Sequence, residues 1–404
     1  MEILTYGDRD YRFSRGRFVE NANVNRKKVI LRCDLNVPVK NNVIKDSSRI
    51  DESLETINYL ISEQAKIIVC SHLGRPRGEY ESSLSLITVK EYLEKKINKE
   101  IKFVPSIIGS ETKKIIDEMQ FGEVCLLENL RFHIGEENCD FEFASKLAEL
   151  ADVYVNDAFG TCHREHSSIV LVPKMLPAFY GYLIRKEVNK IRDFVKNIQK
   201  PFVVILGGAK VSDKIGAIRN LLGKAQTIII GGGMSYTFIN ALGYPIGDSI
   251  CDKDKIELAK EIMTIAVEKE TKLLFPSDVR IGRKFNPKTE NKVVDINEIP
   301  EHWQGLDIGI KAIKHFSKEI EEAKYIYWNG PVGVSEWKAF ENGTYAIAQA
   351  VARSSAESII GGGDSGEAVR RMNLESEISH ISTGGGSSLM FVEGKELPGL
   401  KIFS

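Results

Sequence analysis

Short apolar runs rich in β-branched residues alternate with amphipathic stretches along most of the chain. In the first half, this pattern predicts strands at 29–34, 67–71, 123–128 and 153–156 and helices at 51–63, 85–96 and 141–150. Strands that alternate with helices are typical of βαβ units, which build a mainly parallel sheet with helices on both faces. The pattern therefore predicts an α/β fold.

The alternation is interrupted at 183–198 and then starts again. The segment LIRKEVNKIRDFVKNI predicts one long helix that ends before Pro201, and its few apolar positions are those expected of an exposed connector. A second series follows, with strands predicted at 202–206, 227–231, 272–275, 325–328 and 357–361, whereas 285–309 is less regular and predicted to be rich in loops. Because 404 residues exceed one ordinary core, we expect two doubly wound, Rossmann-like domains with parallel sheets, joined by a long hinge helix.

Four predicted strands of the second half run directly into consecutive glycines. These segments read FVVILGGAK, TIIIGGGM, SIIGGGDS and ISTGGGS. The carboxyl ends of parallel strands share one edge of a sheet, glycine lets the backbone approach a ligand, and N–H groups at a helix start bind phosphate. A single turn of this kind is an ordinary strand–helix connection, but four at one edge predict a site for a polyphosphate.

The third of these turns contains a literal GxGxxG, formed by Gly361, Gly363 and Gly366, which would suggest a dinucleotide enzyme. Two observations speak against that interpretation. Asp364 would place a carboxylate against the pyrophosphate, and no acidic residue ends a strand about 20 residues further on. Because Mg²⁺ takes carboxylate and phosphate oxygens together, the motif predicts a magnesium–nucleotide site, with an NAD-dependent dehydrogenase as the alternative. Glu336 could accept hydrogen bonds from ribose hydroxyls, or could simply be a charge at a helix start.

Basic residues gather at the predicted strand ends of the first half. They are Arg32, Arg49, Arg75, Arg131 and Arg164, accompanied by His72, His163 and His166. The planar guanidinium fork matches phosphate and carboxylate oxygens. Any one of these arginines could equally form a surface ion pair, but five at the ends of separate strands predict a pocket for an anion. His163 and His166 have no Cys or His partner at metal-ligand spacing, so a metal site is not favoured there.

The overall composition argues against several classes of protein. With 55 Lys and Arg against 56 Asp and Glu, the net charge of −1 argues against a dedicated nucleic-acid partner. The six cysteines show no CxxC spacing, which favours reduced thiols in an intracellular protein. No run approaches the ~20 apolar residues of a membrane span, and the amino terminus does not read as a secretory signal, so we expect a cytoplasmic protein with no membrane partner. The polar residues 1–25 are expected to form a surface extension.

Nine motifs taken together resemble one known family. RCDLNVP, SHLGRP, LLENLRF, VNDAFGTCHREHSS, ILGGAKVSDKI, IIGGGM, WNGPVGV, IIGGGDS and STGGGSS occur here in the order found in phosphoglycerate kinases. The resemblance implies a glycolytic enzyme, and a monomer, that transfers phosphoryl groups reversibly between 1,3-bisphosphoglycerate and Mg-ADP, giving 3-phosphoglycerate and MgATP. It also implies in-line transfer after hinge closure. A catalytically inactive homologue that acts as a binding protein is a further alternative, against which the intact Arg49, Lys210 and Asp364 argue.

The resemblance also implies which residues act. Arg49, Lys210 and Gly385 look catalytic, and Asp364 looks like the ligand of the Mg²⁺ cofactor that accompanies ADP or ATP. The phosphoglycerate site would comprise Asp34, Leu35, Asn36, Arg49, His72, Leu73, Gly74, Arg75, Arg131 and Arg164. The nucleotide site would comprise Gly208, Ala209, Lys210, Lys214, Gly232, Gly305, Asn329, Pro331, Glu336, Gly362, Gly363, Asp364 and Ser365. The first site belongs to a domain over 1–185, with the tail 388–404 packed back on it, and the second to a domain over 186–387.

Overall fold

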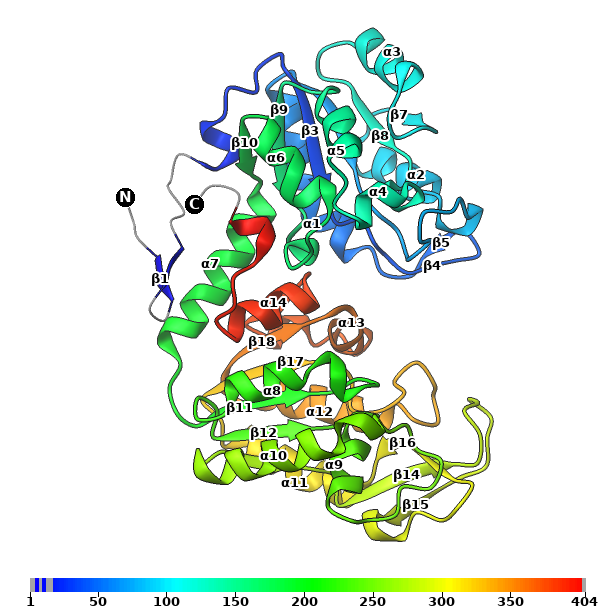
Figure 1. The fold of residues 1–404 in the computed structure, drawn as a ribbon, viewed down its shortest axis with the longest axis vertical. Helices are drawn as coiled ribbons and strands as arrows, with labels where there is room; N and C mark the ends of the chain where they lie inside the picture. Colours follow the sequence, from blue (N-terminus) through cyan, green and yellow to red (C-terminus); the bar gives the residue numbers. More distant parts are fainter. Residues whose placement is uncertain (1–3, 7–8, 12–16, 402–404) are drawn as a thin grey trace. The chain divides into compact units, whose positions relative to one another are not determined.

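The computed structural model describes residues 4–6, 9–11 and 17–401. The chain forms two compact units. One extends to Arg192 and takes in the chain again from Lys395, and the other is Asp193–Gly394. Each unit is built on its own six-stranded sheet (Figure 1). The predicted α/β class with two parallel, helix-covered sheets is confirmed.

The first unit contains the sheet β10-β9-β3-β6-β8-β7, in which every neighbouring pair is parallel. Its strands are β3 (Lys28–Cys33), β6 (Lys66–Cys70), β7 (Ile101–Val104), β8 (Val124–Leu127), β9 (Val153–Asp157) and β10 (Ala178–Tyr180). Alternate residues of β3 enter different cores: Leu31 packs on the side of α1 (Ser48–Ser62) and α2 (Ile87–Ile97), whereas Ile30 packs on the side of α5 (Phe141–Ala148). The sheet is therefore buried on both faces, as continuous apolar strands require.

Several short elements of this unit have no counterpart among the predicted ones. They are β4 (Val39–Lys40), β5 (Val43–Ile44), β7, β10, α3 (Ser110–Glu118), α4 (Ile134–Glu137) and α6 (Val172–Met175). Strands of two to four residues give no clear period in the sequence, so their pairing decides that they exist. No described helix of either unit combines the length and the apolar character needed to cross a membrane.

The second unit contains the sheet β13-β12-β11-β17-β18-β19, which is also parallel throughout. Its strands are β11 (Phe202–Leu206), β12 (Thr227–Ile230), β13 (Lys272–Leu274), β17 (Tyr325–Asn329), β18 (Glu357–Gly361) and β19 (His380–Ser382). Its helices are α8 (Ile215–Leu221), α9 (Ser235–Ala241), α10 (Ile256–Glu268), α11 (Ile310–Glu321), α12 (Asn342–Arg353), α13 (Gly363–Arg371) and α14 (Gly385–Val392). The four glycine turns follow β11, β12, β18 and β19, so they lie at one edge of this sheet, as predicted.

The region 285–309, which is predicted to be less regular and rich in loops, also contains two strands. This region supplies β15 (Asn291–Asp295) and β16 (Gln304–Ile308), which flank β14 (Asp278–Gly282) in an antiparallel sheet. Val279, Ile281 and Trp303 form a small core with residues of α9. The polar hairpin between β14 and β15 hides the alternation of these short strands, so only their pairing reveals them.

The helix α7 (Tyr182–Asn197) exists as predicted, but its apolar residues are not exposed. Ile184, Val188 and Ile191 are all buried, at the spacing of one helix face. The helix has few apolar residues for its length, but their spacing places them in one stripe on one face of the helix. Asp157 accepts hydrogen bonds from the backbone of Leu183 and Ile184 (2.9 and 3.3 Å) and so caps the start of the helix.

The second half of the amino-terminal segment is also more than a surface extension. Val19 and Val24 are buried in the core of the first unit, and Phe18 makes an isolated β-bridge with Tyr180. Further upstream, β1 (Leu4–Tyr6) and β2 (Arg9–Tyr11) pair as an antiparallel hairpin, while residues 1–3, 7–8 and 12–16 of this predicted extension lie outside the described residues.

The chain end also joins the first unit. There the Gly399 amide donates to the Cys162 carbonyl (2.8 Å), and the Tyr180 hydroxyl donates to the Leu400 carbonyl (2.8 Å). Residues 402–404 of the predicted tail lie outside the described residues.

Candidate functional site

A cleft of about 510 Å³ opens at the glycine-rich edge of the second unit. Its volume suits a small-molecule ligand. Seven of the predicted nucleotide residues line it: Gly208, Ala209, Gly232, Gly305, Pro331, Glu336 and Asp364. They come from segments as far apart in sequence as β11 and α13, which the parallel sheet brings to one edge.

Three of the other predicted residues hold the turns of this edge together. The Lys214 ammonium donates to the Gly207 and Asn329 carbonyls (both 2.6 Å) and so links the turns after β11 and β17. The Asn329 side-chain amide donates to the Gly361 and Gly385 carbonyls (both 3.0 Å), which links the last two glycine turns. The Ser365 hydroxyl accepts from the Gly330 amide (2.8 Å). These side chains fix the backbone groups that would meet a phosphate.

Glycine is required where these turns meet. Gly232 has φ +66°, and a Cβ there would lie 2.6 Å from the Gly208 carbonyl oxygen. A Cβ on Gly385 would lie 2.7 Å from the Cα of Gly362, so the backbones of two turns are in direct contact. A larger residue at either position would push the turns apart.

The two lysines of the first glycine turn are in different environments. Burial lowers the pKa of the Lys214 ammonium to about 8, although the nearby Asp364 carboxylate acts in the opposite direction. Lys210 is exposed, and its side chain makes no hydrogen bond or ion pair with the described residues. Lys210 is therefore able to reach a ligand, whereas Lys214 is part of the scaffold and a possible phosphate partner.

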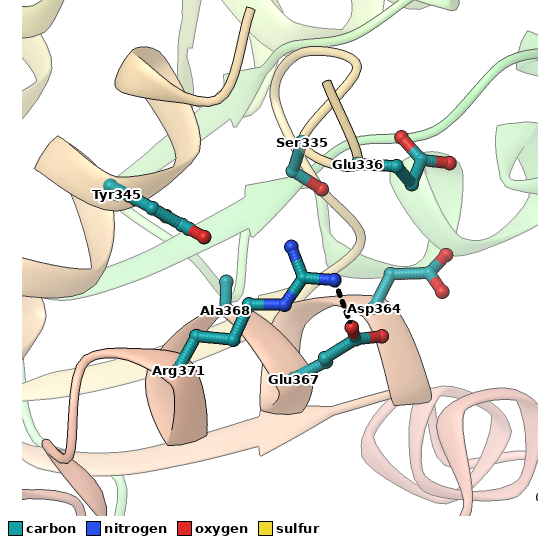
Figure 2. Close-up of a pocket in the computed structure, with 7 residues that line it drawn as sticks. All are labelled: Ser335, Glu336, Tyr345, Asp364, Glu367, Ala368 and Arg371. Carbon is teal, nitrogen blue, oxygen red and sulfur yellow. Dashed lines mark ion pairs between the residues drawn. The ribbon is translucent and has the colours of Figure 1, made fainter. Parts of the chain in front are cut away.

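The carboxylates of Glu336 and Asp364 lie on the same side of this region (Figure 2). Both are exposed, and both line the cleft. Asp364 is in the first turn of α13, where Gly362 precedes the helix with φ +105°. Within the described residues there is no cluster of three or more His, Cys, Asp or Glu side chains suited to a metal ion. A cation at Asp364 would therefore need ligand oxygens from a bound phosphate.

Most of the remaining cleft wall was not predicted from the sequence. It includes Tyr236, Ile250, Phe285, Leu306, Asp307, Val332 and Val334. Phe285 packs against Trp337 with 4.5 Å between ring centroids, which gives the cleft an aromatic and aliphatic wall suited to a flat base. The missed alternation of β16, which contributes Leu306 and Asp307, is the signal that could have identified part of this wall.

Asp307 is the buried acid of that wall. Its carboxylate accepts hydrogen bonds from the Gly343 and Ile308 amides (2.8 and 2.9 Å), and burial raises its pKa to about 7. It therefore ties β16 to the start of α12 beneath the cleft.

In the first unit, hydrogen bonds join the three loops that follow β3, β6 and β8. Arg49 pairs with Asp34 (3.2 Å) and donates to the Asn36 carbonyl (3.1 Å). The Asn36 side chain accepts from the Gly74 amide (2.9 Å), and Arg131 donates to the Gly74 carbonyl (2.6 Å). The predicted convergence of these strand ends therefore occurs.

The interpretation of Arg32 as part of an anion pocket was wrong, because this side chain is fully buried and already compensated. Its Nε donates to the Ser168 hydroxyl (2.8 Å), and its guanidinium lies 3.8 Å from the fully buried Glu136 carboxylate. Ser168 also binds Glu136 through its hydroxyl (2.6 Å) and its amide (3.0 Å). The sequence does not reveal Glu136 as the partner, since it lies about 100 positions away.

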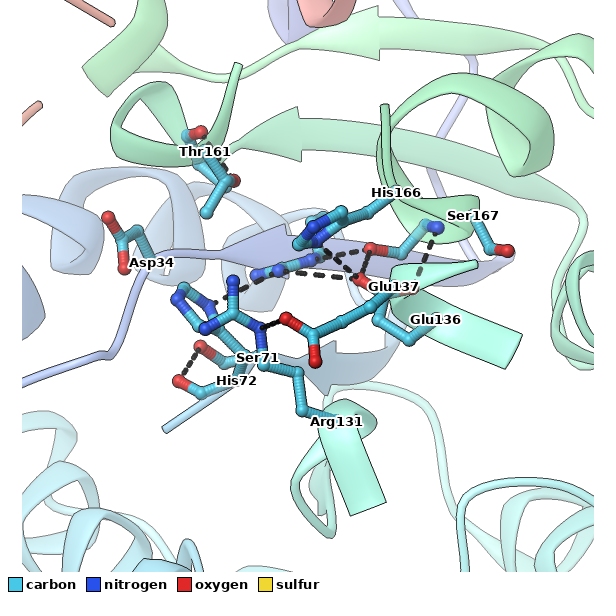
Figure 3. Close-up of polar contacts among 12 residues, drawn as sticks. Asp34, Ser71, His72, Arg131, Glu136, Glu137, Thr161, His166 and Ser167 are labelled. Carbon is cyan, nitrogen blue, oxygen red and sulfur yellow. Dashed lines mark hydrogen bonds and ion pairs between the residues drawn. The ribbon is translucent and has the colours of Figure 1, made fainter. Parts of the chain in front are cut away.

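Arg131 is largely buried and pairs with Glu137 (3.3 Å) beside His72 (Figure 3). Arg75 and Arg164 are exposed, and no carboxylate of the described residues pairs with either. These two arginines are therefore the ones with charge available to an incoming anion. Leu35 and Leu73 are buried, so they could meet a ligand only through their backbones.

The three histidines of this region are neutral at physiological pH. Burial is the main cause, and the neighbouring arginines add to it: the pKa of His166 falls to about 3, that of His163 to about 4, and that of His72 well below its usual range. They can offer hydrogen bonds but no positive charge. The anion specificity of this site thus depends on its arginines.

Comparisons with known proteins agree with this arrangement. The family model described as phosphoglycerate kinase matches residues 19–395. A phosphoglycerate kinase of Clostridium novyi (strain NT) is 48% identical over 96% of this chain and 98% of its own length, and that of Fervidobacterium nodosum is 47% identical over 95% and 96%.

Solved structures give the same result. The phosphoglycerate kinase structure from Coxiella burnetii matches with a TM-score of 0.76 and 39% identity over 95% of this chain and 97% of that one. The one from Pyrococcus horikoshii OT3 matches with a TM-score of 0.83 and 31% identity over 96% and 98%. These similarities do not support a nicotinamide-dependent dehydrogenase or an inactive homologue. The chain belongs to the phosphoglycerate kinase family, and it is a kinase whose acceptor is a carboxyl group.

Proposed function

We propose that the chain transfers a phosphoryl group reversibly between 1,3-bisphosphoglycerate and Mg-ADP, giving 3-phosphoglycerate and MgATP. The observation that supports this most is the cleft of the second unit, which three of the four glycine turns border at one sheet edge. Phosphoryl transfer needs placement and neutralisation of charge more than covalent chemistry. The proposed site residues can place the substrates and neutralise their charge. No general base is needed, because the attacking ADP oxygen is already ionised.

The nucleotide would bind with its base against the apolar wall near Phe285 and its ribose hydroxyls at Glu336. Its phosphates would meet the backbone amides at the start of α13, where Gly362 and Gly363 lie. Lys210 would reach the transferring group, and amides near Gly385 would stabilise the charge that develops on it. The exposure of Lys210 and the Asn329 link between the turns support these roles.

Mg²⁺ fits this site, because Asp364 is an exposed carboxylate at the cleft and hard cations favour such oxygens. We propose that Asp364 holds the ion together with phosphate oxygens of the nucleotide. When bound, Mg²⁺ would neutralise negative charge on the phosphates.

The phosphoglycerate would bind in the first unit. We assign its phosphate to Arg75 and Arg164, whose charges are uncompensated within the described residues. Its hydroxyl and carboxyl groups would meet Asp34, Asn36 and the neutral His72. Arg49 would lie closest to the transferring group. Closure of the hinge at α7 stays a prediction, as does a monomeric state.

The experiment that tests the function is a coupled assay of ATP-dependent phosphorylation of 3-phosphoglycerate. We expect turnover with Mg²⁺ and loss of activity when EDTA removes it, with recovery when Mg²⁺ is restored. Addition of NAD should have no effect. A purified, folded chain without turnover under these conditions would favour the inactive homologue instead.

Nucleotide affinity should depend on pH through Lys214. Because its pKa is about 8, the ammonium is charged below that pH and attracts phosphate, and it loses its charge as the pH rises. We therefore expect the Kd for ADP, measured calorimetrically, to increase above pH 8. Lys214→Arg keeps its charge throughout this range, so its Kd should be nearly constant with pH, whatever its absolute value. An identical rise in the variant would rule out Lys214 as the cause.

A further inference from the structure

A small hollow adjoins the nucleotide cleft along α13. It is lined by Ser335, Glu336, Tyr345, Asp364, Glu367, Ala368 and Arg371 (Figure 2). Glu336 and Asp364 line the large cleft as well, so the two spaces share a wall. A charge in the hollow therefore acts on the part of the cleft that we assign to the ribose and the phosphates.

The residues around the hollow carry more negative than positive charge. Three of the seven lining residues are carboxylates, whereas only Arg371 is a cation. Its guanidinium pairs with Glu367 one turn earlier on α13 (2.5 Å). The nearby Tyr345 and Glu367 side chains raise the pKa of Arg371. Arg371 therefore keeps its charge and has Glu367 as its partner on the same helix.

A nucleoside diphosphate adds several negative charges next to these carboxylates. Charges about 10 Å apart near a protein surface attract or repel each other appreciably at low ionic strength. At an ionic strength of about 0.1–0.15 M, salt largely screens exposed charges that are more than about 8–10 Å apart. Without Arg371, the carboxylates of Glu336, Glu367 and Asp364 would repel the incoming phosphates. Glu367 would also lose the partner that fixes its side chain.

We propose that Arg371 is a positioning residue of the nucleotide site, which offsets these three carboxylates and so allows a nucleoside di- or triphosphate to enter the cleft. The inference rests on the proposed function, because it takes the cleft to be the nucleotide site. Arg371 acts through its neighbours and through its charge, and does not itself contact the reacting groups.

The test is the affinity of Arg371→Met for ADP, measured calorimetrically at low and high salt. At low ionic strength we expect the Kd to rise about three- to tenfold, from the sum of several weak charge interactions. In 0.5–1 M salt the difference should shrink to less than twofold. The KM for 3-phosphoglycerate and kcat at saturating nucleotide should not change.

Two further variants separate charge from structure. Glu367→Gln in the Arg371→Met background removes one repelling carboxylate, so it should return the Kd most of the way to the wild-type value. Arg219→Met is the matched control, because Arg219 forms a half-exposed pair with Glu261 (3.2 Å) in the same unit but does not line the cleft. Its Kd for ADP should equal that of the wild type.

The proposal is overturned if Arg371→Met binds ADP as tightly as the wild type at low salt. It is also overturned if the loss is the same at all salt concentrations and Glu367→Gln does not restore binding, which would indicate a structural role. If the wild-type chain itself does not bind ADP, the proposed function fails, and this inference fails with it.

Discussion

Replacing Arg49 by alanine is expected to lower kcat by about 10²–10³-fold, the scale measured for a single group that stabilises a developing charge. We assign this side chain to the transferring phosphoryl group. Its guanidinium is already oriented by Asp34 (3.2 Å) and the Asn36 carbonyl (3.1 Å), so little ordering is needed when substrate arrives. The measurement is steady-state kinetics in the ATP-forming direction, with both substrates saturating.

The Asp34 pair makes a stability control necessary. Removal of Arg49 leaves the buried Asp34 carboxylate without that partner, which costs about 1–3 kcal/mol. We therefore expect a lower unfolding midpoint together with the loss of kcat. Arg49→Lys should keep the charge near Asp34 and so recover most of the stability, but little of kcat, because lysine lacks the planar fork. Near-normal kcat in Arg49→Ala would contradict the assignment.

The second large effect is expected for Lys210→Ala, which should also lower kcat by about 10²–10³-fold. Here the unfolding midpoint should not change, because the Lys210 side chain is exposed and makes no interaction with the described residues. Kinetics and thermal unfolding of the same preparation test both statements together.

Lys260→Ala is a suitable control for Lys210, because Lys260 is a half-exposed surface lysine of the same unit and pairs only with Glu257 among the described residues. It should retain full activity. The neighbouring Lys214→Ala should behave differently from Lys210→Ala, because it removes the link between the turns after β11 and β17 and should lower the unfolding midpoint as well. A Lys210→Ala enzyme that keeps its kcat would rule out a direct role in transfer.

The elements that could be predicted from the sequence are those with a clear local pattern. The strands β11, β12, β17 and β18 are rich in apolar residues, and the glycine that follows each of them marks where the chain turns. Such patterns depend only on neighbouring residues, so they can be recognised from the sequence alone. The same holds for Asp364, whose place in the first turn of α13 follows from the glycines before it.

Pairing between distant residues could not be predicted in the same way. Arg32, at the end of β3, and Arg75, in the loop after β6, have the same chemistry and both lie near strand ends. The structure shows that Arg32 is fully buried beside Glu136, whereas Arg75 is exposed. Burial of a charge is tolerated only where an opposite charge and hydrogen bonds meet it. That condition depends on the fold of the whole unit.

The sequence by itself determined the α/β class and the alternation of strands and helices that builds parallel sheets. It also determined the glycine-rich sheet edge and the position of Asp364 there. Only the tertiary structure decided which cations face a ligand, that Asn329 and Lys214 connect the turns, and that β16 contributes to the apolar wall of the cleft. The physical reason is that period and turn propensity are local properties of the chain. Ion pairing, burial and cavity walls arise from contacts between residues that are far apart along it.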